Sequence, residues 1–281
     1  MEPLIRIVAG WDQLPLCVRI WYNGDHLPPI LCLPGLVRTG ADFDAVVPLF
    51  AEGRRVVALD YAGRGGSGRS PDVMRYAPEA CLRDVLDVCA ALHLHRVMVV
   101  GTSFGGLLAM GLAAARPGLL RGVVLNDVGP DIETAGAGFV RDFVALDPAG
   151  ESLDECVTFL KPRLTPLTPA TDDDWLALAA QNYERGADGR YHPVWDIAIA
   201  RLLNGKTPDL WPLFGALAHV PVLLVRGEVS TLLSLATVGA MQARRRDMTV
   251  VTVPGVGHAP ILTEAAVRDP LRDFATATDA R

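Results

Sequence analysis

A short apolar segment that ends at a glycine constrains this chain most strongly. Residues 97–106 have the sequence Val-Met-Val-Val-Gly-Thr-Ser-Phe-Gly-Gly. The first four predict a buried strand, and residues 107–116, rich in Leu, Ala and Met, predict a helix. A turn this sharp, within Gly101-x-Ser103-x-Gly105, has no room for side chains at its glycines and holds the serine hydroxyl exposed at its tip. The segment therefore predicts a nucleophilic Ser103 that faces the N-terminus of a helix.

The segments on either side alternate between strand and helix patterns. Strands are predicted at residues 5–9, 16–21, 30–33, 56–59, 97–100, 122–126, 222–226 and 248–253, and helices at 41–50, 78–92, 107–116, 235–243 and 263–275. The polar turn between the first two strands predicts an antiparallel pair. The later alternation is typical of parallel strands joined by crossover helices. We therefore predict an α/β fold with a mostly parallel, eight-stranded sheet and helices on both faces.

Residues 130–211 interrupt this alternation. They contain helical segments, many Pro and Asp residues and no strong strand pattern. We interpret residues 130–211 as an inserted helical cap and residues 1–129 and 212–281 as the core. The cap carries four aromatic residues that we predict to line a substrate pocket: Trp175, Tyr183, Tyr191 and Trp195. The alternative is that these rings form only the hydrophobic core of the cap.

Composition excludes several classes of function. Half of the 281 residues are hydrophobic, which suits one large domain, and the net charge of -6 gives no basic surface for nucleic acid. The five cysteines are an odd number without a C-x-x-C pair or metal-like spacing, which favours reduced thiols. We expect no secretory signal, because Glu2 and a broken apolar run stand at the N-terminus, and no run of about eighteen apolar residues is present. We expect a cytoplasmic protein that acts on a small molecule without membrane association; the oligomeric state is left open.

The glycine-rich segment of residues 60–68 superficially resembles a phosphate-binding loop. It lacks the terminal Lys-Ser/Thr of a P-loop and the glycine spacing of a dinucleotide site, so we predict no cofactor and no metal. We interpret it as a tight loop that shapes the site. Arg64 within it is expected to bind nearby carbonyl groups or Asp60.

Polar residues follow several predicted strands at the point where each strand ends. In an open parallel sheet, ligands bind beyond the carboxyl ends of the strands. Ser103, Asp127 and His258 all fall on this edge. A serine hydroxyl needs a base within hydrogen-bond reach, itself oriented by a third group. His258 lies in a glycine-rich loop after a strand, which suits such a base.

Five motifs resemble those of the α/β-hydrolase superfamily, and the similarity covers nearly the whole chain. They are Leu33-Pro-Gly-Leu36, Asp60-Tyr-Ala-Gly-Arg-Gly-Gly-Ser-Gly68, Gly101-Thr-Ser-Phe-Gly105, Asn126-Asp-Val-Gly-Pro130 and Gly255-Val-Gly-His-Ala-Pro260. The resemblance implies a serine nucleophile, an acid and a histidine base in that chain order, with Ser103 first and His258 last. It also implies an oxyanion hole formed by the backbone N–H groups of Leu36 and Phe104. Pro34 departs from the His-Gly pair that is common in the family, but the donor at Leu36 is a backbone group.

The acid of the triad is the main departure from the family pattern. Relatives usually carry an Asp where this chain has Thr231. Three alternatives remain: Asp127 after the sixth strand, Glu228 in the loop after the seventh strand, or no acid. Haloalkane dehalogenases place their acid after strand six, so we favour Asp127. Its alternative role is to cap the turn into Gly129 and Pro130.

The leading hypothesis is a cofactor-free serine hydrolase, similar to serine esterases. It would cleave a small or medium carboxylic ester, lactone or thioester through an acyl-enzyme on Ser103, with water activated by His258. One alternative is a carbon–carbon bond hydrolase of vinylogous diketones. Another is a degenerate hydrolase-fold protein that only binds a ligand. Dehalogenase and epoxide hydrolase chemistry is disfavoured because those relatives have Asp at the position of Ser103.

Overall fold

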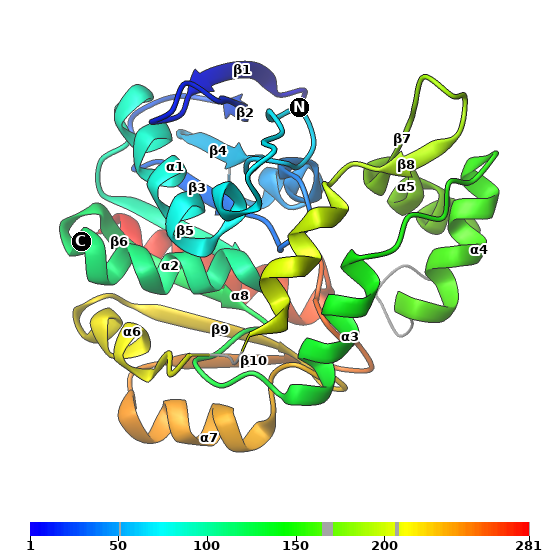
Figure 1. Cartoon of the computed structure of the whole chain (residues 1–281). Helices are drawn as coiled ribbons and strands as arrows, with labels where there is room; N and C mark the ends of the chain where they lie inside the picture. Colours follow the sequence, from blue (N-terminus) through cyan, green and yellow to red (C-terminus); the bar gives the residue numbers. More distant parts are fainter. Residues whose placement is uncertain (51, 165–170, 206–207, 281) are drawn as a thin grey trace.

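The computed structural model describes residues 1–50, 52–164, 171–205 and 208–280. Its centre is an eight-stranded sheet with the strand order β1-β2-β4-β3-β5-β6-β9-β10 (Figure 1). The strands are β1 (Leu4–Ala9), β2 (Pro15–Tyr22), β3 (Ile30–Leu33), β4 (Arg55–Leu59), β5 (Val97–Thr102), β6 (Leu120–Asn126), β9 (Val222–Gly227) and β10 (Thr249–Val253). β2 pairs antiparallel with β1 and β4, and the other ladders are parallel. The mostly parallel sheet predicted from the sequence is confirmed.

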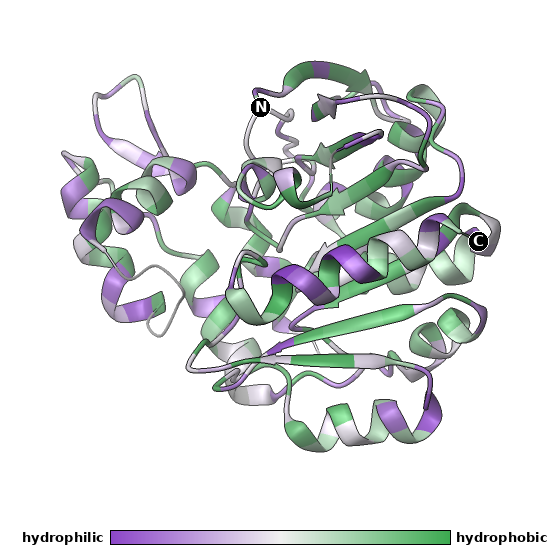
Figure 2. Cartoon of the chain, turned by 180° about the vertical axis from the view of Figure 1, so that it is seen from behind, coloured by the Kyte–Doolittle hydropathy of each residue, from purple (hydrophilic) through white to green (hydrophobic). Residues whose placement is uncertain are grey.

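Helices cover both faces of this sheet. The α-helices of the described residues are α1 (Pro78–Ala91), α2 (Phe104–Ala115), α3 (Thr134–Val144), α4 (Leu153–Leu164), α5 (Asp172–Asn182), α6 (Trp211–Gly215), α7 (Leu235–Arg244) and α8 (Ala265–Asp279), of which α3, α4 and α5 lie beside the sheet (Figure 1). Alternate strand residues point to opposite faces. Leu31 and Val99 pack with α1 and α2, whereas Ile30 and Met98 pack on the side of α8. In Figure 2 the strands are mostly hydrophobic while α8 carries both kinds of residue, as expected for a helix with one buried face.

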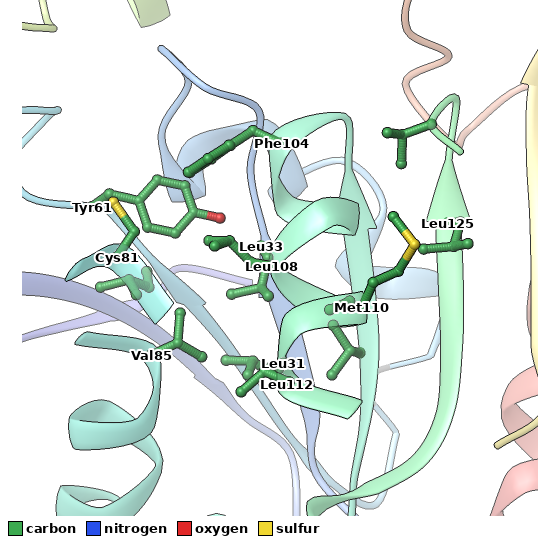
Figure 3. Close-up of a cluster of buried hydrophobic side chains, with 14 of the residues drawn as sticks. Leu31, Leu33, Tyr61, Cys81, Val85, Phe104, Leu108, Met110, Leu112 and Leu125 are labelled. Carbon is green, nitrogen blue, oxygen red and sulfur yellow. The ribbon is translucent and has the colours of Figure 1, made fainter. Parts of the chain in front are cut away.

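The core on the α1 and α2 side lies directly beneath the predicted nucleophile. Figure 3 shows this cluster, with Phe104 and Tyr61 side by side and leucines from β3 and α2 packed near them. The two rings meet edge to face, with centroids 5.4 Å apart. Each fully buried side chain of this size contributes about 1.5–3 kcal/mol to folding. The turn that carries Ser103 therefore lies on a closely packed cluster of buried hydrophobic side chains.

One predicted helix is wrong. Residues 41–50 form two separate 3-10 segments, η1 (Gly40–Phe43) and η2 (Val47–Leu49). Pro48 lies within η2, and its ring nitrogen has no hydrogen to donate to a continuous α-helical ladder. Phe43 and Val47 nevertheless pack on the α8 side of the sheet, as a helix there would have done.

The segment between β6 and β9 contains α3, α4, α5 and the 3-10 helix η5 (Ile197–Asn204), which gather at one side of the sheet (Figure 1). It also contains a hairpin of β7 (Tyr183–Arg185) and β8 (Tyr191–Pro193), which the sequence did not predict. Strands of three residues show too little alternation to be recognised. Residues 165–170 and 206–207 of the predicted cap lie outside the described residues. The division of the chain into core and cap stays a prediction.

The cysteines and helices bear on two further expectations. All five cysteines belong to the described residues, and all are buried and free. Burial raises the pKa of the Cys17 and Cys81 thiols to about 11, so both are protonated at neutral pH.

Among the helices that the structure describes, none has the length and apolar character needed to cross a membrane.

Candidate active site

The turn between β5 and α2 holds Ser103 in an unusual backbone conformation. Its φ is 51° and its ψ is -117°, and α2 begins at the next residue. A Cβ atom at Gly105 would overlap the carbonyl oxygen of Leu33, and one at Gly101 would lie 2.6 Å from the carbonyl of Gly105. Both positions therefore accept only glycine, and the turn matches the prediction made from Gly101-x-Ser103-x-Gly105.

Three residues from separate strand ends form one hydrogen-bonded series. His258 lies in the loop after β10, and its Nε2 is 2.9 Å from Ser103 Oγ. Its Nδ1 is 2.8 Å from Oδ2 of Asp127, which follows β6. This order of hydroxyl, imidazole and carboxylate is the arrangement that lets a histidine take a proton from a serine.

The structure places the two candidate acids, and the Thr231 position where relatives carry an Asp, in different surroundings. Asp127 is fully buried beside His258 and has a positive φ of 54°, a conformation that Asp tolerates better than most residues. Glu228 accepts the N–H of Gly255 at 2.8 Å with its Oε2. Thr231 is exposed. The geometry thus favours Asp127 over Glu228 as the partner of the histidine.

The loop after β3 lies against the nucleophile. A Cβ atom added to Gly35 would lie 3.9 Å from Ser103 Cβ, so the peptide that carries the Leu36 N–H is next to Ser103. Phe104 is the first residue of α2, a position whose N–H has no partner within the helix. Both predicted oxyanion donors therefore belong to segments that border Ser103.

Two buried side chains from the loop after β4 bind the loop after β3, which carries the predicted oxyanion donor Leu36. Tyr61 donates its hydroxyl to the Pro34 carbonyl at 3.1 Å, and Arg64 donates Nε to the Leu36 carbonyl at 2.8 Å. Arg64 is fully buried and donates Nη1 to the Ala62 carbonyl at 2.6 Å. Its guanidinium lies 5.7 Å from the ring centroids of Tyr61 and Tyr76. Arg64 binds carbonyl groups as predicted, and it fixes the peptides on both sides of the Leu36 N–H together with Tyr61.

The same loops are connected to the segment between β6 and β9. Arg38 binds both carboxylate oxygens of Asp42, at 2.7 and 2.5 Å, and donates Nη1 to Asn182 Oδ1 at 2.6 Å. The Gly65 N–H donates to the Val194 carbonyl at 2.7 Å. Sequence reasoning missed Arg38 and Asn182, because their contact joins positions 144 residues apart.

The four aromatic residues predicted to bind substrate lie within this segment, and two of them, Tyr183 and Trp195, pack on each other. Trp195 is 1% exposed and donates its indole N–H to the Val144 carbonyl at 3.0 Å. Its ring centroid is 6.0 Å from that of Tyr183. Trp175 and Tyr183 are buried, whereas Tyr191 is half-buried. This packing favours a structural role for most of the rings, and contact of any of them with substrate stays a prediction.

No group of three or more His, Cys, Asp and Glu side chains within the described ranges is arranged to hold a metal ion.

Comparison with known proteins places this geometry in a family. A match to the alpha/beta hydrolase family spans residues 30–275. The chain is 34% identical over 256 residues to a 3-hydroxybutyrate-oligomer hydrolase of Cupriavidus necator, covering 86% of this chain and 87% of that protein. It is 29% identical over 232 residues to a 2-(acetamidomethylene)succinate hydrolase of Mesorhizobium japonicum, covering 82% and 81%.

A solved structure agrees with these sequence matches. The crystal structure of an alpha/beta hydrolase from Novosphingobium aromaticivorans superposes with a TM-score of 0.92 at 36% identity, covering 98% of each chain. The fold predicted from the motifs is thereby confirmed. The chain belongs to the alpha/beta hydrolase family.

Proposed function

We propose that this chain is a serine hydrolase that cleaves carboxylic esters through an acyl-enzyme on Ser103. The observation that carries the proposal is the series from Ser103 Oγ through His258 to the buried Asp127 carboxylate, with distances of 2.9 and 2.8 Å. Nucleophile, base and orienting acid at these distances are the parts that acyl transfer requires.

The two half-reactions follow from this arrangement. His258 Nε2 takes the hydroxyl proton while Ser103 Oγ bonds to the ester carbonyl carbon, and the N–H groups of Leu36 and Phe104 bind the resulting oxyanion. Asp127 stabilises the imidazolium that forms. The imidazolium then gives its proton to the leaving alcohol as the C–O bond breaks, which leaves the acyl-enzyme. Water, deprotonated by His258, attacks the acyl carbon and releases the acid and Ser103.

The similarity to the 3-hydroxybutyrate-oligomer hydrolase supports a substrate class. Units of a hydroxy acid in such oligomers are joined by ester bonds. We therefore propose short esters of hydroxy acids as substrates, within the small or medium esters, lactones and thioesters expected from the sequence.

The carbon–carbon bond hydrolase is the second candidate. The similarity to the 2-(acetamidomethylene)succinate hydrolase keeps it in view, because the substrate in that name is an unsaturated dicarboxylate with an acetamido group, so such relatives are not restricted to simple esters. The same serine, histidine and carboxylate would serve both reactions. Turnover of a hydroxybutyrate dimer against a panel of vinylogous diketones separates the two.

The test of the proposed function is the Ser103→Ala variant. We expect loss of at least about a thousandfold in ester turnover, because triad members act as a unit and the remaining rate comes from the oxyanion hole and binding. The variant should also lose labelling by a fluorophosphonate, with an unchanged circular dichroism spectrum. A ligand-binding protein without catalysis would show neither turnover nor labelling in the wild type, and a variant that keeps a tenth of the activity would exclude Ser103 as the nucleophile.

A further inference from the structure

Ser230, in the loop after β9, makes a short contact with the candidate acid. Its Oγ is 2.6 Å from Asp127 Oδ2. The same Oγ accepts the N–H groups of Leu232 at 3.3 Å and Leu233 at 3.2 Å. Because the two backbone donors occupy its lone pairs, the hydroxyl proton is directed to the carboxylate.

The Asp127 carboxylate receives donors on both oxygens. Oδ1 accepts the Gly227 N–H at 2.9 Å, and Oδ2 accepts both Ser230 and His258 Nδ1. Asp127 is fully buried, so these donors replace the water that a carboxylate would otherwise bind. Two of the donors come from the end of β9 and the loop that follows it, and they fix the carboxylate plane against rotation.

The position of Ser230 in the sequence shows how its contact with Asp127 differs from the family pattern. It immediately precedes Thr231, the position at which the resemblance expects the acid of the triad. In this chain the acid lies on β6, and the loop after β9 provides a hydroxyl donor to it. A second carboxylate in that loop would bring like charge toward Asp127, whereas a hydroxyl stabilises it.

We propose that Ser230 is a positioning residue that orients the Asp127 carboxylate toward His258 and disperses part of its charge. This inference rests on the proposed function of Ser103, His258 and Asp127. Ser230 does not touch the reacting atoms. Loss of its hydroxyl frees the carboxylate to rotate, and it concentrates negative charge on the oxygen that faces the imidazole. The first effect lowers kcat, and the second changes the hydrogen bond between Asp127 Oδ2 and His258 Nδ1.

The charged groups around this contact stay the same when Ser230 is changed. Arg226 of β9 is buried and donates to the carbonyls of Leu233 and Glu228 at 2.9 and 3.0 Å, which holds the loop in place. The Glu228 carboxylate faces Gly255. A change at the Nδ1 proton of His258 on removal of the hydroxyl is therefore assigned to the Asp127 contact.

The experiment compares Ser230→Ala and Ser230→Thr with a matched control, Ser234→Ala. Ser234 caps α7 by accepting the Thr237 N–H at 3.2 Å, so its loss weakens the same loop and helix without touching Asp127. We expect Ser230→Ala to lower kcat about tenfold or more at constant KM, in the range typical of residues that orient a catalytic group. Ser230→Thr should retain most of the wild-type kcat, and Ser234→Ala should lower only the melting temperature.

The proton on His258 Nδ1 provides a measurement that does not depend on turnover. It lies in the 2.8 Å hydrogen bond to Asp127 Oδ2, so its NMR resonance reports on the orientation and charge of that carboxylate. We expect this resonance to shift in Ser230→Ala and to stay unchanged in Ser234→Ala. A Ser230→Ala protein with unchanged kcat and an unchanged resonance would overturn the inference, as would losses equal to those of Ser234→Ala. If the wild type shows neither turnover nor fluorophosphonate labelling, the proposed function fails, and the resonance still decides whether Ser230 acts on the Asp127 and His258 pair.

Discussion

The carboxyl edge of the sheet and the segment between β6 and β9 hold their side chains in different ways. At the sheet edge, each candidate catalytic residue follows a strand and is fixed by directional hydrogen bonds, such as those that converge on Asp127. In the segment, Trp195 and its neighbours are held mainly by packing of ring on ring. Hydrogen bonds hold the atoms that transfer a proton to within tenths of an ångström, whereas the packing of rings determines only the shape of the segment. We infer that the sheet edge determines the reaction and the segment determines the substrate.

The largest effect that tests this comparison is expected at Asp127. Asp127→Asn keeps the size of the side chain but removes the charge that stabilises the imidazolium of His258. We expect kcat to fall by about two to four orders of magnitude at neutral pH with little change in KM. Steady-state kinetics on a hydroxybutyrate dimer measures this.

Thr231→Asp is the partner experiment. If Asp127 is the acid, adding a carboxylate at Thr231 should change turnover little. A silent Asp127→Asn together with a more active Thr231→Asp would show that the triad lacks its acid. A silent Asp127→Asn without that gain would make Glu228 the next residue to test.

A smaller loss of kcat is expected when Arg64 is changed, because its buried guanidinium binds the loop after β3 that carries Leu36. Arg64→Met keeps the volume but leaves the Leu36 and Ala62 carbonyls without their donor. We expect kcat to fall about ten- to a hundredfold with KM nearly constant, because the loop then holds the Leu36 N–H less firmly. Tyr61→Phe, which removes only the bond to Pro34, should cost less. Equal losses in kcat and in the folded fraction would indicate a purely structural role.

A still smaller effect on catalysis is expected at the aromatic residues of the segment. It distinguishes rings that contact substrate from rings that only pack in the core. Trp195 is buried and Tyr191 is half-buried, so only Tyr191 has a ring surface that a ligand can contact. Trp195→Ala should lower the free energy of unfolding by about 3–5 kcal/mol. Tyr191→Ala should leave stability nearly unchanged and alter kcat/KM severalfold between short and long acyl groups. Uniform kinetic effects across acyl lengths would assign both rings to the core of the segment.

The same contrast explains how much the sequence could predict. Ser103 was predictable because strand, turn and helix lie within one continuous stretch. Asp127 was favoured over Glu228 only through the resemblance to haloalkane dehalogenases, since the choice depends on which carboxylate reaches His258 in space. The contact between Ser230 and Asp127 spans 103 residues, and no local pattern records it.

Local patterns also failed in both regions for identifiable reasons. Pro48 divides the helix predicted at residues 41–50 into two 3-10 segments. The strands of the hairpin between Tyr183 and Pro193 are three residues long, too short to show their alternation. Both errors concern backbone pairing, while the burial of the apolar residues was anticipated.

The smallest expected effect is a pH dependence of stability confined to the segment between β6 and β9. His192 of β8 lies between two carboxylates, with Nδ1 2.7 Å from Asp147 and Nε2 3.1 Å from Asp188. Hydrogen bonds to Asp147 and then to Asp188 raise the pKa of this imidazole above its usual value. A raised pKa in the folded state means that the charged histidine stabilises the fold fully below about pH 6.5, its value in the unfolded chain, and that this contribution is lost as the pH rises through the folded value. Hydrogen exchange at the amides of the hairpin should therefore become faster between about pH 6 and pH 8 than the intrinsic rate predicts. His192→Gln should remove this excess, whereas His95→Gln, at an exposed histidine before β5, should not. The sheet edge should show no such change in either variant, and a hairpin whose protection is independent of pH would mean that the two carboxylates do not hold a charged His192.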